Sequence, residues 1–235
     1  KACLSGTATI ADADMHIRAG ESRIIMTGGM ESMTNAPHLL NGARFGYAYG
    51  GTQLVDSLNQ DGLMCAFDKV LMGQSTDLNN AKLGIGRAEQ DEWAAASHDR
   101  AIAAADSGAF DAEIVAVEVP QRRGDPVVIG RDEGMRPGTT TETLGNLRAA
   151  FLADGTVTAG NASQISDGAA ALVVADRSAA EELGMPVVAE VLSYGQTAGP
   201  DTSLQAQPAN AIRIALDKVG FDVADLDLIE INEAF

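Results

Sequence analysis

The alternation of helical and strand patterns along the chain is the feature that most restricts its fold. Residues 5–19 carry small apolar side chains at helical spacing, and Gly20 follows them as a stop signal. The apolar run Ile24-Ile25-Met26 comes next and is typical of a buried strand, which the pair Gly28-Gly29 is expected to end. A helix, a strand and a glycine pair in this order predict a parallel α/β sheet.

Similar patterns recur over the rest of the chain. We expect further helices at about 53–67, 79–85, 87–107, 178–184 and 208–219, and further strands at 113–119, 170–175, 187–194 and 226–231. Two loops, 31–51 and 120–141, are rich in glycine and proline. The α/β elements at the two ends therefore enclose an insertion of roughly 31–156.

The composition excludes several classes of function. Aromatic residues make up only 4% of the 235 residues and glycine is frequent, so we expect closely packed layers. The net charge of −17 opposes binding to nucleic acid and to anionic membranes. No apolar run reaches the roughly 18 residues that a membrane span needs. Two cysteines are too few for a disulfide framework, so a reducing cytoplasm is the simpler setting.

The two ends of the sequence do not resemble the ends of a complete domain. The chain starts at Lys1-Ala2-Cys3 without an initiator methionine, and it ends at Phe235 just after a predicted strand. Because complete domains usually end in frayed polar residues, we expect this chain to be a fragment of a longer one.

Cys3 is the side chain best placed for covalent chemistry, because it immediately precedes a predicted helix. The positive end of a helix stabilises a thiolate and lowers the thiol pKa, which makes such a cysteine a good nucleophile. The tetrapeptide alone favours the alternative of a small buried hydrophobe. Cys65, within a predicted helix, is interpreted as a core residue.

Other polar segments have simpler interpretations. Residues 160–163 form either a loop with side-chain to backbone bonds or a polar edge that holds an amide-bearing ligand. The acidic cluster Glu89, Asp91 and Glu92 is interpreted as a solvated helix start. The histidines, at positions 16, 38 and 98, lack metal-ligand spacing, so we expect no metal.

Four ordered motifs together resemble the thiolase family over essentially the whole chain. They are Cys3-Leu4-Ser5-Gly6, Gly28-Gly29-Met30-Glu31-Ser32-Met33, the stretch 156–163 with Asp167-Gly168-Ala169-Ala170, and Asn232-Glu233-Ala234-Phe235. The resemblance is closest to the acetyl-CoA acetyltransferase branch. It implies a five-layer α/β/α/β/α fold built of two similar halves with an inserted loop domain, here incomplete at both ends. On that map, 1–30 and 159–176 belong to the first half, 31–158 is the loop domain over the CoA site, and 187–235 opens the second half.

The resemblance also implies roles for single residues. Cys3 matches the nucleophile that takes the acyl group as a thioester, and Asn232 matches the residue that positions a water in the other oxyanion hole. The implied substrate contacts are Ser163 at the pantetheine arm, Arg136 and Phe151 at the adenosine end, and Leu63, Met72 and Phe235 along the pantetheine and acyl channel. The family's activating histidine and second catalytic cysteine follow the Asn-Glu-Ala-Phe motif and are not among these residues, so we expect the 235 residues to be inactive alone.

The implied reaction joins two acetyl-CoA into acetoacetyl-CoA and CoA, or runs in reverse. CoA enters as part of the substrate, no other cofactor is implied, and the family forms homodimers or homotetramers. Three alternatives remain open: a degradative 3-ketoacyl-CoA thiolase, a non-catalytic thiolase-like protein that binds acyl-CoA or lipid, and a generic α/β domain. Cys3 argues against a pure binding protein, and the four ordered motifs argue against a generic domain.

Overall fold

The structure, a computed structural model, describes all residues from 1 to 235. The chain divides into two compact units, which are described separately. The first comprises residues 1–75 and 165–232, and the second comprises residues 76–164 and 233–235. None of the helices is both long enough and apolar enough to cross a bilayer.

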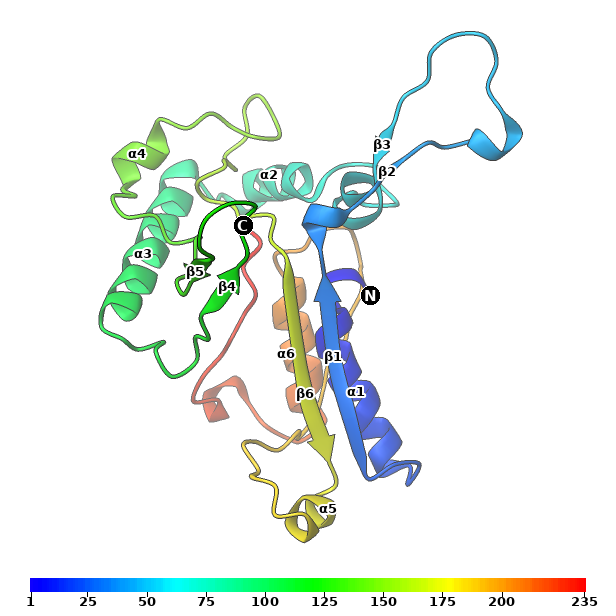
Figure 1. Cartoon of the computed structure of the whole chain (residues 1–235), viewed down its shortest axis with the longest axis vertical. Coiled ribbons are helices and arrows are strands. Elements are labelled where there is room, and N and C mark those ends of the chain that lie inside the picture. The colour runs from blue at the N-terminus through cyan, green and yellow to red at the C-terminus, as the bar shows by residue number, and fades with distance from the viewer. The chain divides into compact units, whose positions relative to one another are not determined.

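The first unit is built around two long strands and one helix. Strand β1 (Ile24–Glu31) pairs with β6 (Gly168–Ala175) in an antiparallel register, from Ile24 opposite Ala175 to Glu31 opposite Gly168. Helix α1 (Ser5–Arg18) lies along β1 (Figure 1). The side chains that α1 buries are the small residues Ala8 and Ala13, which let the helix approach the sheet closely.

The predicted parallel pairing is wrong, because all three strand pairs in the structure are antiparallel. Gly28 and Gly29 also do not end the strand, since β1 continues through them to Glu31. These glycines are needed for space rather than for a turn. A Cβ on Gly28 would lie 2.6 Å from the carbonyl oxygen of Ala170, and a Cβ on Gly29 would lie 3.0 Å from the Cα of Gly6.

The remainder of the first unit consists of short elements. A two-residue pairing of β2 (His38–Leu39) with β3 (Val55–Asp56) holds the base of a projecting loop. The helical elements are η1 (Ala2–Leu4), η2 (Met33–Asn35), η3 (Ala43–Phe45), the π-helix η4 (Leu58–Leu63), α5 (Arg177–Glu182), α6 (Gln207–Asp217) and η5 (Val223–Asp225). The predicted helix at 53–67 is therefore replaced by β3 and η4.

Two predicted strands of this unit, 187–194 and 226–231, do not form. No neighbouring strand pairs with either segment, and a strand requires a hydrogen-bonded partner. Val188 and Leu228 are 96% and 92% exposed, although their sequences are typical of buried strands.

The second unit is mainly helical. Helix α2 (Met72–Leu83) begins just before the unit, and α3 (Arg87–Asp106) and α4 (Thr141–Gly145) follow. The predicted strand at 113–119 is reduced to β4 (Val117–Val119), which pairs with β5 (Val127–Ile129) inside the segment that was predicted to be a loop. The most buried side chains of the second unit are Val157 and Thr158, on the segment that precedes Asn161.

Candidate active site

Cys3 lies in the 3₁₀ turn η1, which runs directly into α1. Its side chain is exposed and forms no disulfide, so it is not the buried hydrophobe of the alternative interpretation. The first turn of α1 has no acidic residue, and its N-cap residue Leu4 makes no side-chain cap hydrogen bond. The first turn of α1 therefore places no carboxylate of its own beside the exposed thiol.

Two of the sequence motifs meet where β1 ends and β6 begins. Asp167 accepts hydrogen bonds from the backbone N–H of Thr34 (2.9 Å) and from the hydroxyl of Ser32 (3.1 Å). The side-chain amide of Asn35 donates to the same hydroxyl at 2.8 Å. These bonds, first among them the one from the Thr34 N–H, lower the pKa of Asp167 against the opposing effect of desolvation. The carboxylate thus fastens the turn that follows the glycine pair.

The other three predicted site residues of the first unit have different environments. Leu63 ends η4 and Met72 starts α2, and both are half-buried. An isolated antiparallel bridge joins their chain neighbours Met64 and Leu71, so the backbone passes close to itself between Leu63 and Met72. Asn232 is exposed and lies in neither a helix nor a strand.

The second unit contains the four remaining predicted residues. The rings of Phe151 and Phe235 meet edge to face, with centroids 6.2 Å apart and planes at 81°. The backbone N–H of Ser163 donates to the carbonyl oxygen of Ala234 at 2.9 Å, so Ser163 lies beside the same segment. Arg136 is separate from these three: its side chain is exposed and forms no ion pair, and its backbone N–H donates to Nδ1 of His98 at 3.3 Å.

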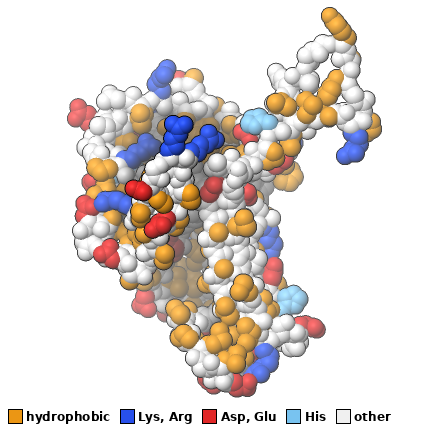
Figure 2. Space-filling view, viewed as in Figure 1, with side chains coloured by type: hydrophobic (Ala, Val, Ile, Leu, Met, Phe, Trp, Pro, Cys, Tyr) orange, Lys and Arg blue, Asp and Glu red, His pale blue; other side chains and the backbone are white.

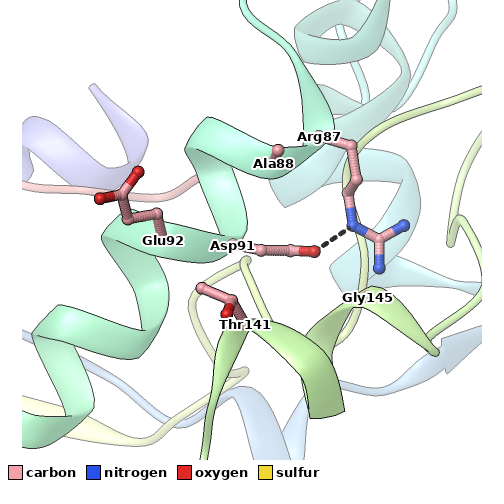
Figure 3. Close-up of a pocket in the computed structure, with 6 residues that line it drawn as sticks. All are labelled: Arg87, Ala88, Asp91, Glu92, Thr141 and Gly145. Atoms are coloured by element: carbon pink, nitrogen blue, oxygen red, sulfur yellow. Dashed lines mark hydrogen bonds and ion pairs between the residues drawn. The ribbon is translucent and has the colours of Figure 1, made fainter.

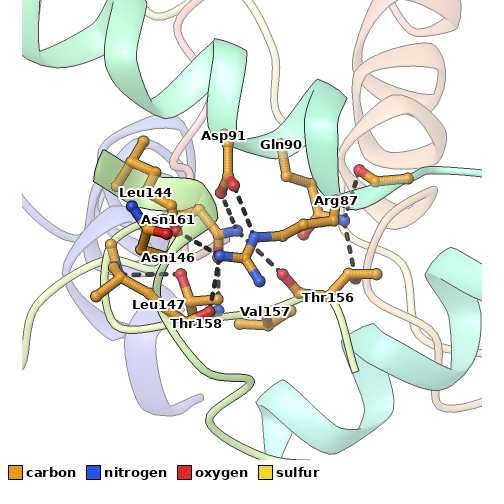
Figure 4. Close-up of polar contacts among 12 residues, drawn as sticks. Arg87, Gln90, Asp91, Leu144, Asn146, Leu147, Thr156, Val157, Thr158 and Asn161 are labelled. Atoms are coloured by element: carbon orange, nitrogen blue, oxygen red, sulfur yellow. Dashed lines mark hydrogen bonds and ion pairs between the residues drawn. The ribbon is translucent and has the colours of Figure 1, made fainter. Parts of the chain in front are cut away.

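A buried polar network of the second unit was not predicted from the sequence (Figure 4). Nε of Arg87 pairs with Asp91 at 2.7 Å, and the amide of Asn161 donates to the other oxygen of Asp91 at 2.9 Å. The Asn161 oxygen accepts from the N–H of Thr158 at 2.7 Å. The network holds the segment before Ser163 against α3.

The interpretation of the acidic cluster as a solvated helix start is wrong for Asp91, which is only 3% exposed. Glu89 and Glu92 are exposed as expected, and Glu89 accepts the N–H of Gly86 at 2.9 Å. The spacing of Arg87 and Asp91, four residues apart on one helix face, was the available signal for the buried pair.

Two open pockets lie in the second unit, and neither includes a predicted site residue. The larger, of about 610 Å³, lies between α3 and α4 and is lined by Arg87, Ala88, Asp91, Glu92, Thr141 and Gly145. Figure 3 shows Arg87 directed at Asp91, so its charge is already compensated. The smaller, of about 380 Å³, is lined partly by Trp93, Arg100 and Glu233, and the indole N–H of Trp93 donates to Glu233 at 3.2 Å.

The side chains that could bind a metal are dispersed. No group of three or more histidine, cysteine, aspartate or glutamate residues is arranged to hold a metal ion.

The chain belongs to the thiolase family. Residues 1–178 match the model of the thiolase N-terminal domain, and residues 185–235 match that of the thiolase C-terminal domain. The resemblance in the four motifs is thereby confirmed, and with it the thiolase fold.

Several relatives that match over the whole chain are named acetyl-CoA acetyltransferase or probable acetyl-CoA acetyltransferase. A probable acetyl-CoA acetyltransferase of Mycolicibacterium smegmatis is 54% identical over 235 residues, and an acetyl-CoA acetyltransferase of Pseudomonas aeruginosa is 45% identical over 236. The chain spans 61% and 60% of these two proteins, respectively.

Solved structures of two acetyl-CoA acetyltransferases also match nearly the whole chain. The acetyl-CoA acetyltransferase of Syntrophomonas wolfei matches with a TM-score of 0.92 at 37% identity, over 99% of this chain and 58% of its own. The corresponding enzyme of Bacillus anthracis matches with a TM-score of 0.90 at 38% identity, over 99% of this chain and 59% of its own.

Proposed function

We propose that the protein containing this chain transfers acetyl groups between CoA thioesters through a thioester on Cys3. The observation that most supports this is the exposed thiol at the uncapped start of α1, in a chain that belongs to the thiolase family. The names of the relatives support acetyl-CoA as the acyl donor.

In the first half of the proposed reaction, the Cys3 thiolate attacks the carbonyl carbon of acetyl-CoA. A bond forms between the Cys3 sulfur and this carbon, the bond to the CoA sulfur breaks, and CoA leaves as a thiolate that takes up a proton. The backbone N–H of Cys3 contributes to stabilising the oxyanion. No electron is gained or lost by the protein, so this transfer requires no redox cofactor.

In the second half, a second acetyl-CoA loses a proton from its methyl carbon, and that carbon attacks the Cys3 thioester. Acetoacetyl-CoA leaves and the Cys3 thiolate returns. We assign Asn232 to position the water that stabilises the second oxyanion. The proton transfers belong to groups outside these 235 residues.

The substrate contacts are proposed on the same basis. We assign Ser163 to the pantetheine arm and Phe235, which lies in the segment beside it, to the pantetheine and acyl channel. We assign Phe151, whose ring meets that of Phe235 edge to face, to the adenosine end. We assign Leu63 and Met72, whose chain neighbours Met64 and Leu71 form a bridge, to apolar positions along the pantetheine and acyl channel. The exposed guanidinium of Arg136, which forms no ion pair, is available to the adenosine and phosphate end.

Replacement of the proposed nucleophile tests the function directly. Cys3→Ala in the complete protein should abolish thiolysis of acetoacetyl-CoA, with a loss of at least about 10³-fold, because no covalent intermediate forms. Cys65→Ala is the matched control: this thiol is half-buried and accepts the N–H of Asp68 at 3.5 Å. Equal losses in the two variants, or an unchanged rate in Cys3→Ala, would refute the proposal.

A degradative thiolase acting on longer chains is the second candidate. It is favoured by a relative from Staphylococcus epidermidis, 44% identical over 235 residues, that is named a probable acetyl-CoA acyltransferase. Thiolysis rates for 3-ketoacyl-CoA substrates of four to sixteen carbons would separate the two candidates. A preference for four carbons supports the acetyltransferase, and a rate that rises with chain length supports the degradative enzyme.

Three further expectations remain proposals. The protein is proposed to act in the cytoplasm as a homodimer or homotetramer. The division into a first thiolase half, a loop domain at 31–158 and the start of a second half also stands as a proposal. The projecting loop between β2 and β3 is proposed as the contact that pairs dimers.

A further inference from the structure

The first turn of α1 lies directly on the backbone of β1, at the contact between Gly6 and Gly29. A Cβ on Gly29 would lie 3.0 Å from the Cα and 3.2 Å from the amide nitrogen of Gly6. Both atoms belong to the backbone of the helix, so no flexible side chain can move aside. A side chain at position 29 would therefore displace the first turn of α1 by a few tenths of an ångström.

The contact is asymmetric, which makes it testable. A Cβ on Gly6 would lie 3.8 Å from the Cα and from the nitrogen of Gly29, which is an ordinary van der Waals distance. The hydroxyl of Thr9 donates to the carbonyl oxygen of Gly6 at 2.7 Å and lies 3.5 Å from that of Gly28. The first turn is thus linked to β1 by close backbone packing at Gly29 and by a long contact through Thr9.

We propose that Gly29 is a positioning residue for the nucleophile and acts through Gly6. Cys3 lies three residues before Gly6 in the same continuous helical segment, so a displacement of the first turn moves the sulfur with it. The thiol remains at the positive end of its own helix, and therefore keeps its intrinsic reactivity. What changes is the place of the sulfur relative to a bound thioester, and a shift of about 1 Å in reacting atoms can cost on the order of 10²-fold in rate.

This inference rests on the proposed function, and two reactions of Cys3 separate position from reactivity. One is acetylation by saturating acetyl-CoA, measured as a single turnover in the complete protein. The other is alkylation by iodoacetamide, a small reagent that needs no binding site. Because the expected displacement is a few tenths of an ångström, Gly29→Ala should slow acetylation by about three- to tenfold and change alkylation by less than about twofold.

Gly168→Ala is the matched control. Gly168 lies in β6 opposite Glu31, and a Cβ there would meet nothing within 4 Å. The Gly168→Ala variant carries the same additional methyl group in the same sheet, and we expect it to be acetylated at the wild-type rate. Circular dichroism and the melting temperature of each variant show whether the fold is retained.

The same contact can be approached from the helix side if Gly29→Ala does not fold. Gly6→Ala adds a Cβ at an ordinary distance, whereas the branched side chain of Gly6→Val would press on Gly29. Acetylation should fall much further in the valine variant than in the alanine variant, again with little change in alkylation.

Distinct results would overturn the inference. Acetylation of Gly29→Ala at the wild-type rate, or a parallel fall in alkylation, excludes a positioning role, as does equal acetylation by the two Gly6 variants. A wild-type protein that is not acetylated at all would instead refute the proposed function, and this inference would fall with it.

Discussion

At the scale of single residues, Asn161 shows how one buried side chain holds the segment that carries a proposed substrate contact. Its side-chain amide donates to Asp91 and to the carbonyl oxygen of Thr156. Its side-chain oxygen accepts from the backbone N–H of Thr158, a residue that is completely buried. Ser163 follows two residues later, so the position of this proposed substrate contact depends on the network.

Asn161→Ala should lower the free energy of unfolding by about 2–4 kcal/mol, because it leaves a buried N–H and a buried carboxylate oxygen without their partner. Urea denaturation measures the loss. Asn146→Ala is the control, since Asn146 is exposed and its side chain makes one hydrogen bond, to the carbonyl oxygen of Glu142 at 3.0 Å; the change should cost about 0.5 kcal/mol. Equal losses in the two variants would contradict the structural role of Asn161.

At the scale of elements, Asp167 connects the start of β6 to the turn η2 after β1. Its pKa is lowered in the folded state by the hydrogen bonds that it accepts, chiefly from Thr34. The unfolded chain therefore binds a proton at a higher pH than the folded one. The stabilisation is fully present above the unfolded pKa of about 4, and it is lost as the pH falls through the lower, folded value.

Asp167→Asn should release this turn at neutral pH, because the neutral amide is a weaker acceptor than the carboxylate. Hydrogen exchange should show the Thr34 amide exchanging faster in the variant than in the wild type at pH 7. Asp227→Asn is the control, since Asp227 is exposed and makes no hydrogen bond in the structure. Unchanged protection of Thr34 in Asp167→Asn would refute the connection.

The sequence predicts those elements whose own residues determine them. Helices α1, α3, α5 and α6 are found within a few residues, because each has an apolar period and a glycine stop, a proline start or a capping aspartate. Strands β1 and β6 are found because their apolar runs are long enough to recognise. Their antiparallel pairing is not predicted from the sequence, since it depends on contacts between residues about 145 apart in the chain.

The failures have the same origin. Segments 187–194 and 226–231 have strand sequences, but a strand forms only with a partner. Gly28-Gly29 was expected to end the strand because a sequence does not show which backbone approaches a glycine. The position of Cys3 before a helix was predictable from four residues, whereas the burial of Asp91 depends on Asn161, 70 residues away.

At the scale of the whole molecule, the projecting loop between β2 and β3 exposes several large apolar side chains. Phe45 is 93% exposed and Tyr49 is fully exposed, and Figure 2 shows hydrophobic side chains along the loop. Exposed apolar groups of this kind typically mark interaction sites, which supports the proposal that this loop joins copies of the protein.

Phe45→Ser combined with Tyr49→Ser should reduce the mass of the assembly in light scattering, for example from tetramer to dimer, because the loop loses its apolar contact. The melting temperature of the protomer fold should change little. Phe67→Ser is the control, as Phe67 is 87% exposed but lies outside the loop. An unchanged mass in the double variant would exclude the loop as the contact.

Peptide mapping of the acetylated protein tests the thioester on Cys3 most directly. The complete protein is mixed with acetyl-CoA, quenched in acid and digested with trypsin, which places Cys3 in the peptide 2–18 and Cys65 in the peptide 45–69. We predict the added mass of one acetyl group on peptide 2–18, lost on treatment with neutral hydroxylamine, and none on peptide 45–69. An unmodified peptide 2–18 beside active enzyme would contradict the account.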